Sequence, residues 1–115
     1  MYGDDQQHDD TKQRAEEAYE AGRYDEAVQL FEKSADHDAL TAHQEQMLGR
    51  SYYQVGRFDD AVDPLESAVK ESPTPQAVSR LISAYERTGQ SEERDQICER
   101  FGDWPDYADA VEQCP

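Results

Sequence analysis

The residues of this chain that could carry out chemistry are its histidines, its cysteines and its many carboxylates. His8, His37 and His43 have no serine or cysteine nucleophile arranged beside them in a recognisable motif. The sequence also lacks a phosphate-binding loop, a zinc-ligand spacing and a dinucleotide fingerprint. With 27 acidic residues in 115, carboxylate pairs arise by chance. We therefore expect neither catalysis nor a bound cofactor.

Two features could hold a metal or a covalent crosslink. Two aspartate pairs flank His8, but they lack the spaced ligands and the central glycine of a calcium loop, so we expect a solvated tail and no metal site. Cys98 and Cys114 belong to no metal-ligand pattern. Because disulfides are rare in the cytosol, we expect both thiols to be reduced and unpaired.

The charge of the chain limits the class of partner. A formal net charge of −16 repels phosphate groups, which disfavours nucleic acid and anionic membranes as partners. No run approaches the roughly 20 apolar residues of a membrane span, and the first residues do not form a secretory signal, so we expect a cytoplasmic protein. Low lysine content and the absence of asparagine are typical of proteins from salt-loving, halophilic organisms, although an acidic surface can also serve solubility alone.

The elements that must position any functional residue are repeated helices. Residues 22–28 read GRYDEAV, residues 56–62 read GRFDDAV, and a weaker copy of this turn and helix start occupies residues 89–94. Self-similarity at a period of 33 or 34 residues indicates a repeat architecture. Around the second copy, residues 42–73 carry two stripes that are apolar on one side only. The two helices must therefore pack against each other and against neighbours.

The central unit resembles the tetratricopeptide repeat, with Glu45 in place of the usual tryptophan. The residues at that motif's spacings are Leu48, Gly49, Tyr52, Ala61, Leu65 and Pro73. The first repeat is divergent, since Ala15 and Ala18 replace the family's glycine and tyrosine, and the third repeat matches less well. The resemblance implies an all-α fold in which three helical hairpins form a right-handed α-solenoid covered by a C-terminal capping helix.

This interpretation divides the chain into a short tail and one domain. We expect a disordered acidic tail over residues 1–9 and a single domain over residues 10–113. The repeats would span about residues 8–41, 42–74 and 75–104, and the capping helix about residues 105–113. The helical spacing and the start and stop signals predict helices over about 10–21, 25–37, 41–55, 59–71, 75–88 and from 91 to 101.

Individual residues add local expectations. Pro64 removes a backbone donor inside the fourth helix, so we expect a bend there, or a helix that starts only near Pro64. Thr74 is placed to cap the fifth helix, with Pro75 in its first position. Arg94 replaces the family's small alanine, which predicts a looser third hairpin. Trp104 would pack over the apolar edge of the last repeat rather than bind a partner. The chain could also be part of a longer protein.

The resemblance also implies which residues face a concave groove, because the first helix of each pair lines it in this family. Helical spacing makes each set contiguous on one face. In so acidic a chain, the lysine and three arginines on or beside this surface are notable. The implied groove residues are Lys12, Glu16, Tyr19, His43, Gln46, Arg50, Tyr53, Ser79, Arg80, Ser83, Glu86 and Arg87.

These residues predict a non-catalytic protein-interaction module that binds a peptide or a partner domain in the groove. Tyr19 and Tyr53 would provide flat apolar contact, and the arginines would engage carboxylates of the partner. Alternatively, the tyrosines only pack between repeats and the arginines pair with nearby glutamates. Some family members hold a C-terminal carboxylate with lysine and asparagine. That clamp is not expected here, because asparagine is absent and Glu16 occupies one of its places.

A second hypothesis is a structural role. In that case the open ends of the stack would mediate self-association or docking within a longer protein. The chain itself is then expected to be a monomer or to self-associate weakly.

Overall fold

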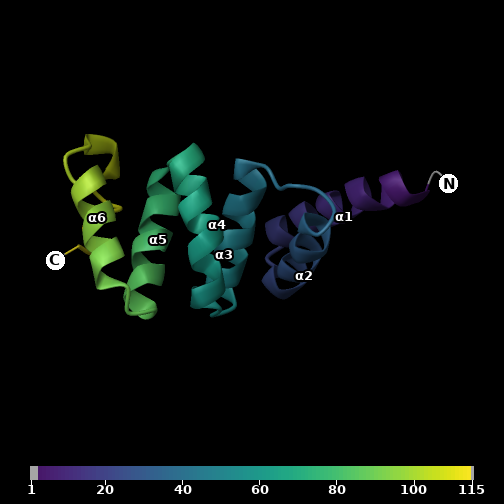
Figure 1. Cartoon of the computed structure of the whole chain (residues 1–115), viewed down its shortest axis with the longest axis horizontal. Coiled ribbons are helices and arrows are strands. Elements are labelled where there is room, and N and C mark those ends of the chain that lie inside the picture. The colour runs from purple at the N-terminus through teal and green to yellow at the C-terminus, as the bar shows by residue number, and fades with distance from the viewer. Residues whose placement is uncertain (1–2, 115) are drawn as a thin grey trace.

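The computed structural model describes the backbone of residues 3–114 and the side chains of residues 11–114. Within this part the chain is all-helical, as predicted, and its helices follow one another along an elongated molecule of 54 × 24 × 23 Å (Figure 1). Three hairpins are formed by the pairs α1–α2, α3–α4 and α5–α6. The elements are α1 (Gly3–Glu20), α2 (Tyr24–Ala35), α3 (Ala42–Gln54), α4 (Phe58–Glu71), α5 (Pro75–Arg87), α6 (Ser91–Phe101) and the 3-10 helix η1 (Pro105–Tyr107).

Helices α3 and α5 begin where side chains satisfy their free backbone donors. The Thr41 hydroxyl accepts from the backbone N–H of Gln44 at 3.1 Å, and the Gln44 side chain accepts from the backbone N–H of Thr41 at 3.0 Å. Thr74 accepts from the N–H of Ala77 at 3.1 Å, with Pro75 in the first helical position. Since such caps contribute about 1 kcal/mol each, the local sequence fixes both helix starts. The cap and proline predicted for α5 are confirmed.

The turns inside the hairpins share one geometry. Gly22 and Gly56 adopt φ values of 80° and 82°, in the left-handed region that favours glycine. The residue after each glycine donates its N–H to a carbonyl five residues back, at 2.8 Å for Arg23 and 2.9 Å for Arg57. This is the Schellman arrangement that ends a helix. The same bond pattern recurs at the third turn, so the repeated sequence makes a repeated turn.

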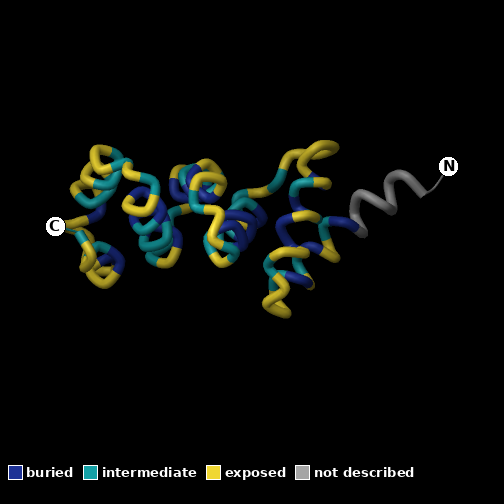
Figure 2. The backbone as a smooth tube through the Cα atoms, turned by 90° about the horizontal axis from the view of Figure 1, so that it is seen from below, coloured by how far each residue is buried: buried dark blue, intermediate teal, exposed yellow. Residues whose placement is uncertain are grey.

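Within a hairpin, small residues let the helices approach closely. A Cβ atom on Gly49 would lie 2.8 Å from Cγ of Leu65, closer than real Cβ contacts allow. In the divergent first hairpin, Ala15, Ala18 and Ala27 are completely buried, so small side chains serve the same purpose. Figure 2 shows buried positions along the helices and mainly exposed positions at the turns between them. The core is therefore a continuous seam along the stack.

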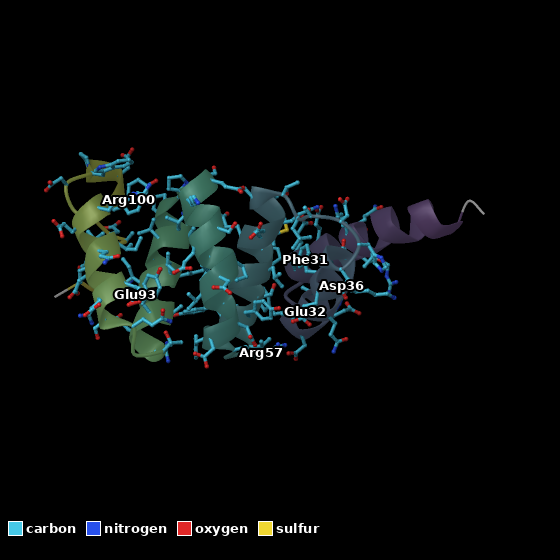
Figure 3. All side chains as sticks on the ribbon, viewed as in Figure 1. Phe31, Glu32, Asp36, Arg57, Glu93 and Arg100 are labelled. Carbon is cyan, nitrogen blue, oxygen red and sulfur yellow. A yellow bond between two sulfur atoms is a disulfide. The ribbon has the colours of Figure 1, made fainter. Side chains whose placement is uncertain are left out.

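Between hairpins, a tyrosine–glutamate hydrogen bond is repeated. The Tyr52 hydroxyl on α3 donates to Glu32 on α2, and the Tyr85 hydroxyl on α5 donates to Glu66 on α4. Glu32 also pairs with Arg57 at 3.4 Å, and Figure 3 shows these two side chains at the boundary of the first two hairpins. Each tyrosine–glutamate bond ties the second helix of one repeat to the first helix of the next.

The first helix starts earlier than predicted. Helix α1 begins at Gly3, although the sequence predicted a helix start near Asp10 after a disordered tail. Residues 1 and 2, and the side chains of the first ten residues, lie outside the described part. The rejected metal site around His8 also lies there. Among the side chains that are described, no group of three or more potential ligands could hold a metal ion.

The C-terminal segment differs from the predicted capping helix. Pro105–Tyr107 forms one 3-10 turn, and residues 108–113 continue as turns. Trp104 contacts the rings of Phe101 and Tyr107 at 5.2 and 5.5 Å, but 48% of it is exposed. It therefore packs on the last repeat from the outside. The prediction that it serves as a core residue is wrong, because about half of its surface remains exposed. The buried aromatic residue of this segment is Tyr107.

The cysteines are joined, which corrects the prediction of free thiols. Cys98 of α6 and Cys114 form a disulfide. The turns after α6 bring their Cα atoms to 6.1 Å, within the range that a disulfide spans. The cellular compartment alone favours free thiols, whereas the approach of these two cysteines depends on tertiary packing.

Two expectations concern the last two hairpins. Helix α4 runs continuously through Pro64, so a helix start near that residue is wrong, whereas the expected bend stays a prediction. Helix α6 has Phe101 as its buried residue, and α5 contacts α6 less extensively than α3 contacts α4. Arg94 instead reaches Glu86 and Asp95, with N···O distances of 3.7 and 3.0 Å. The third hairpin is looser, as predicted from Arg94.

Candidate functional site: the surface of the first helices

The first helices of the three hairpins are neighbours, since α3 contacts both α1 and α5. Their side chains reach from one helix to the next. The Nη1 group of Arg50 on α3 donates to the hydroxyl of Tyr19 on α1 at 3.1 Å. The Cζ atom of Arg50 also lies 5.6 Å from the centroid of the Tyr19 ring. The hydrogen bond raises the pKa of Arg50, so Arg50 remains a cation.

Tyr24 belongs to the same cluster, although it begins the second helix of its hairpin. Its ring meets that of Tyr19 edge-on at 5.8 Å. The equivalent pair 34 residues later is Tyr53 and Phe58, whose rings meet edge-on at 5.2 Å. The repeat period therefore places two aromatic pairs along one side of the stack.

Two further arginines come from α5. Arg80 is half-buried, and burial, followed by the positive charge of Arg50, lowers the pKa of Arg80. The two residues stand on adjacent helices, since α3 contacts α5. The guanidinium of Arg87 lies over the ring of Phe58, with its Cζ 4.7 Å from the centroid. We call these residues the arginine–aromatic cluster: Tyr19, Tyr24, Arg50, Tyr53, Phe58, Arg80 and Arg87.

The cations of this cluster differ from three other arginines of the chain in their partners. Among the described side chains, neither Arg50 nor Arg80 nor Arg87 forms an ion pair. The Nε atom of Arg50 is buried without a hydrogen-bond acceptor. Three arginines outside the cluster hold carboxylates at N···O distances of 2.8, 2.8 and 3.0 Å: Arg23 with Glu26, Arg57 with Asp60 and Arg94 with Asp95.

The C-terminal segment covers the α5 end of this surface. The Gln113 side chain accepts a hydrogen bond from Ser83 Oγ at 2.9 Å and donates to Ser79 O and Oγ at 3.1 and 3.3 Å. Asp106 and Asp109 of the same segment line a pocket together with Arg80. The two serines of the third repeat are therefore hydrogen-bonded to the C-terminal segment of the same chain.

Comparison with protein families decides the assignment of the fold. Residues 18–85, more than half of the chain, match the family described as tetratricopeptide repeat. The chain belongs to the tetratricopeptide repeat family. No curated protein sequence matches the chain.

Solved structures of other proteins share its fold. The first such domain of Spaghetti (RPAP3), solved with the HSP90 peptide SRMEEVD, superimposes with a TM-score of 0.69 and 21% identity, covering 96% of this chain and 91% of that one. The type III secretion translocator chaperone SycD of Yersinia enterocolitica gives a TM-score of 0.64 and 16% identity, covering 91% and 89%. At these identities the likeness concerns the fold.

Some of the groove residues implied by the tetratricopeptide resemblance are already engaged within the domain. Glu16 accepts from Gln44 at 3.0 Å, and Gln46 donates to Thr74 at 3.2 Å. Lys12 pairs with Asp38 at 2.8 Å. These contacts lie within the domain and leave the arginines as the charged groups with unused donors.

Of two further groove residues implied by the resemblance, one is exposed and the other is engaged in an ion pair. His43 is exposed at the start of α3, whereas Glu86 pairs with Arg94 of the next helix. Sequence reasoning missed Tyr24, Phe58 and Gln113. Tyr24 and Phe58 occupy equivalent places in successive repeats, 34 residues apart, and each follows a tyrosine that was implied, but nothing in the sequence places Gln113 against α5.

Proposed function

We propose that this tetratricopeptide repeat domain is a non-catalytic protein-interaction module that binds an acidic peptide or partner segment across α1, α3 and α5. The observation that carries the proposal is the pair Arg50 and Arg80, two half-buried cations on the adjacent helices α3 and α5 without a carboxylate partner among the described side chains. A chain with 27 acidic residues could have paired them internally. A carboxylate from a partner would relieve the repulsion between the two cations.

The aromatic members of the cluster supply the rest of the binding surface. Tyr19, Tyr24, Tyr53 and Phe58 are each partly buried, so their rings retain accessible area on a rigid support. Tyrosine and arginine are the residues that most often dominate binding energy at protein interfaces. The Tyr19 hydroxyl accepts from Arg50, so its own proton can be donated to a carboxylate oxygen.

The partner is expected to differ from the peptide held by the Spaghetti domain. In this chain Lys12 is paired with Asp38 and Glu16 is bonded to Gln44, so the lysine and asparagine clamp of some family members is not reproduced. A net charge of −16 also disfavours a polyanion such as nucleic acid, which would meet the acidic surface as well as the cluster. We therefore favour a partner segment whose acidic groups are confined to the part that meets the arginine–aromatic cluster.

A screen of amidated dodecapeptides displayed on phage tests this function. Selected peptides should be enriched in Asp and Glu, and Arg50→Gln with Arg80→Gln should weaken their binding at least about tenfold, because hydrogen bonds between ions contribute about 1.5–3 kcal/mol. The matched control, Lys33→Gln with Lys70→Gln, removes the same charge from exposed positions and should leave affinity within about twofold. Selection of neutral peptides, or equal losses in both variants, would refute an acidic partner.

A second candidate function is self-association or docking through the C-terminal end of the stack. It is favoured by Trp104, the large hydrophobic side chain that is 48% exposed. Sedimentation equilibrium of the intact chain and of Trp104→Ala separates the candidates. A dimer that dissociates on this substitution would support docking through the end, whereas a monomer in both cases would leave the first helices as the binding surface.

The cellular setting is also a proposal. We propose a cytoplasmic protein from a halophilic prokaryote, supported by the acidic composition. No helix in the described part of the chain is long and apolar enough to cross a membrane. The disulfide argues against a cytoplasmic location, because such bonds persist most readily in oxidising compartments. Trapping the thiols with an alkylating reagent in intact cells would show which state is present.

A further inference from the structure

The C-terminal segment 103–114 returns along the third repeat and ends on groove residues. Tyr107 is buried, stacks on Phe101 at 4.8 Å and donates its hydroxyl to the carbonyl oxygen of Pro73 at 3.0 Å. Ala110 is buried as well. The middle of the segment is therefore firmly packed, whereas its last residues depend on other contacts.

Those last residues are held by the disulfide, by a few hydrogen bonds and by the partial packing of Val111 and Cys114 against the core. Gln113 is exposed, and hydrogen bonds between neutral groups exposed to water contribute little net stability. The bond between Cys98 and Cys114 is adjacent to Gln113 and fixes the end of the segment to α6. Without it, the Gln113 side chain has only its bonds to Ser79 and Ser83 to keep it on α5.

The position of Gln113 conflicts with a ligand on α5. Ser79 and Ser83 lie one helical turn apart on the face that the resemblance assigns to the groove, and Gln113 uses the hydrogen-bonding groups of both. Arg80 lies between them in sequence and lines a pocket with Asp106 and Asp109. The segment therefore places an amide and two carboxylates where an acidic peptide would approach Arg80.

We infer that the C-terminal segment is a strap that occludes the α5 end of the groove, and that the Cys98–Cys114 disulfide keeps it closed. This inference rests on the proposed function of the groove. In the switching step a dithiol reductant is oxidised to a disulfide. The Cys98–Cys114 bond breaks, and its two sulfur atoms take up two electrons and two protons to become thiols. Residues 111–114 then leave α5, while Tyr107 remains as the anchor.

Hydrogen exchange tests the opening itself. Peptides covering residues 108–114 should exchange faster in the full chain after dithiothreitol treatment, and as fast without reductant in the Cys98→Ser, Cys114→Ser variant. Peptides around Tyr107 and Phe101 should change little. Equal exchange of residues 108–114 in the oxidised and reduced chains would overturn the inference.

Binding tests the consequence for the groove. The probe is an amidated dodecapeptide of alternating Glu and Tyr, titrated by fluorescence anisotropy. Its affinity should rise at least about threefold on reduction, since occlusion lowers the population of the binding-competent state. Gln113→Ala with the disulfide intact should give part of this gain. The Cys98→Ser, Cys114→Ser variant serves as the control, because its affinity should be high and insensitive to dithiothreitol.

The two measurements distinguish the two proposals. Equal binding in both redox states would refute occlusion and leave the groove function standing. Faster exchange of the strap without peptide binding in either state would count against the groove function and against its occlusion, leaving only the opening of the segment. Weaker binding after reduction would mean that the strap supports the site, and would also overturn the inference.

Discussion

At the scale of single residues, Gly49 shows how the sequence sets the spacing of two helices. An added Cβ would lie 2.8 and 2.9 Å from Cγ and Cδ2 of Leu65 and 3.3 Å from its backbone nitrogen. Leu65 is completely buried, so its side chain has little room to turn away. The glycine is required here for close approach of α3 and α4.

Gly49→Ala should therefore destabilise the domain even though alanine favours helices. We expect a loss of about 1–3 kcal/mol in the free energy of unfolding, as for other overpacked cores. Urea denaturation followed by circular dichroism measures it. Combining Gly49→Ala with Leu65→Ala should cost less than the sum of the single changes, because the second substitution removes the clashing atoms. Strict additivity would argue against this explanation.

Some single residues could be interpreted from sequence and others could not. The cap at Thr74, the proline after it and the turn glycines follow local rules, so their prediction succeeded. The disulfide between Cys98 and Cys114 required the path of the turns after α6, which depends on tertiary packing. The cluster around Arg50 was implied by family resemblance, but its lack of carboxylate partners is visible only in three dimensions.

At the scale of elements, hairpins are connected through equivalent tyrosines. Tyr52 and Tyr85 occupy the same place in successive repeats, and each donates to a glutamate of the preceding hairpin. Burial, followed by the hydrogen bond to the glutamate, raises the pKa of each phenol above its ordinary value of 10. The protonated phenol is therefore the form that the folded state stabilises.

This shift predicts a loss of stability at alkaline pH. Below pH 10 the contribution of the two phenols is fully present. Above pH 10 the unfolded chain loses these protons while the folded chain keeps them, so stability falls as pH rises. Thermal melts between pH 8 and pH 11 should show a smaller decline in Tyr52→Phe with Tyr85→Phe than in the unchanged chain. Parallel declines would mean that other groups cause the loss.

The helix boundaries show where element prediction worked. Helices α3 to α6 lie within a residue or so of their expected ranges, because turn glycines and proline end or begin them. The predicted capping helix over 105–113 failed, since the aromatic packing of Tyr107 on Phe101 and the disulfide favour a compact turn. Tertiary contacts therefore overrode the helical pattern in this last segment.

At the scale of the whole molecule, the dominant quantity is a net charge of −16 on an elongated stack. Like charges repel in the compact state more than in the unfolded chain. Salt shortens the range of this repulsion, from about 10 Å at 0.1 M to about 3 Å at 1 M. The folded state should therefore gain stability from salt.

Thermal melts in dilute buffer and in molar KCl test this effect. We expect the midpoint to rise by several degrees in KCl, equivalent to about 1 kcal/mol for a domain of this size. Replacing the exposed Asp59, Asp63 and Glu71 by their amides should reduce the gain. A midpoint that does not rise with salt would contradict both the repulsion argument and the halophilic origin.

The repeated tyrosine–glutamate bond also provides a rule for building longer arrays. Since Glu32 meets Tyr52 and Glu66 meets Tyr85 in the same manner, residues 42–74 carry both halves of a connector. A duplicate of that segment inserted after residue 74 would offer Tyr52 of the copy to Glu66 of the original, and Glu66 of the copy to Tyr85. The natural chain thus contains an interchangeable building block from which a groove of chosen length could be assembled.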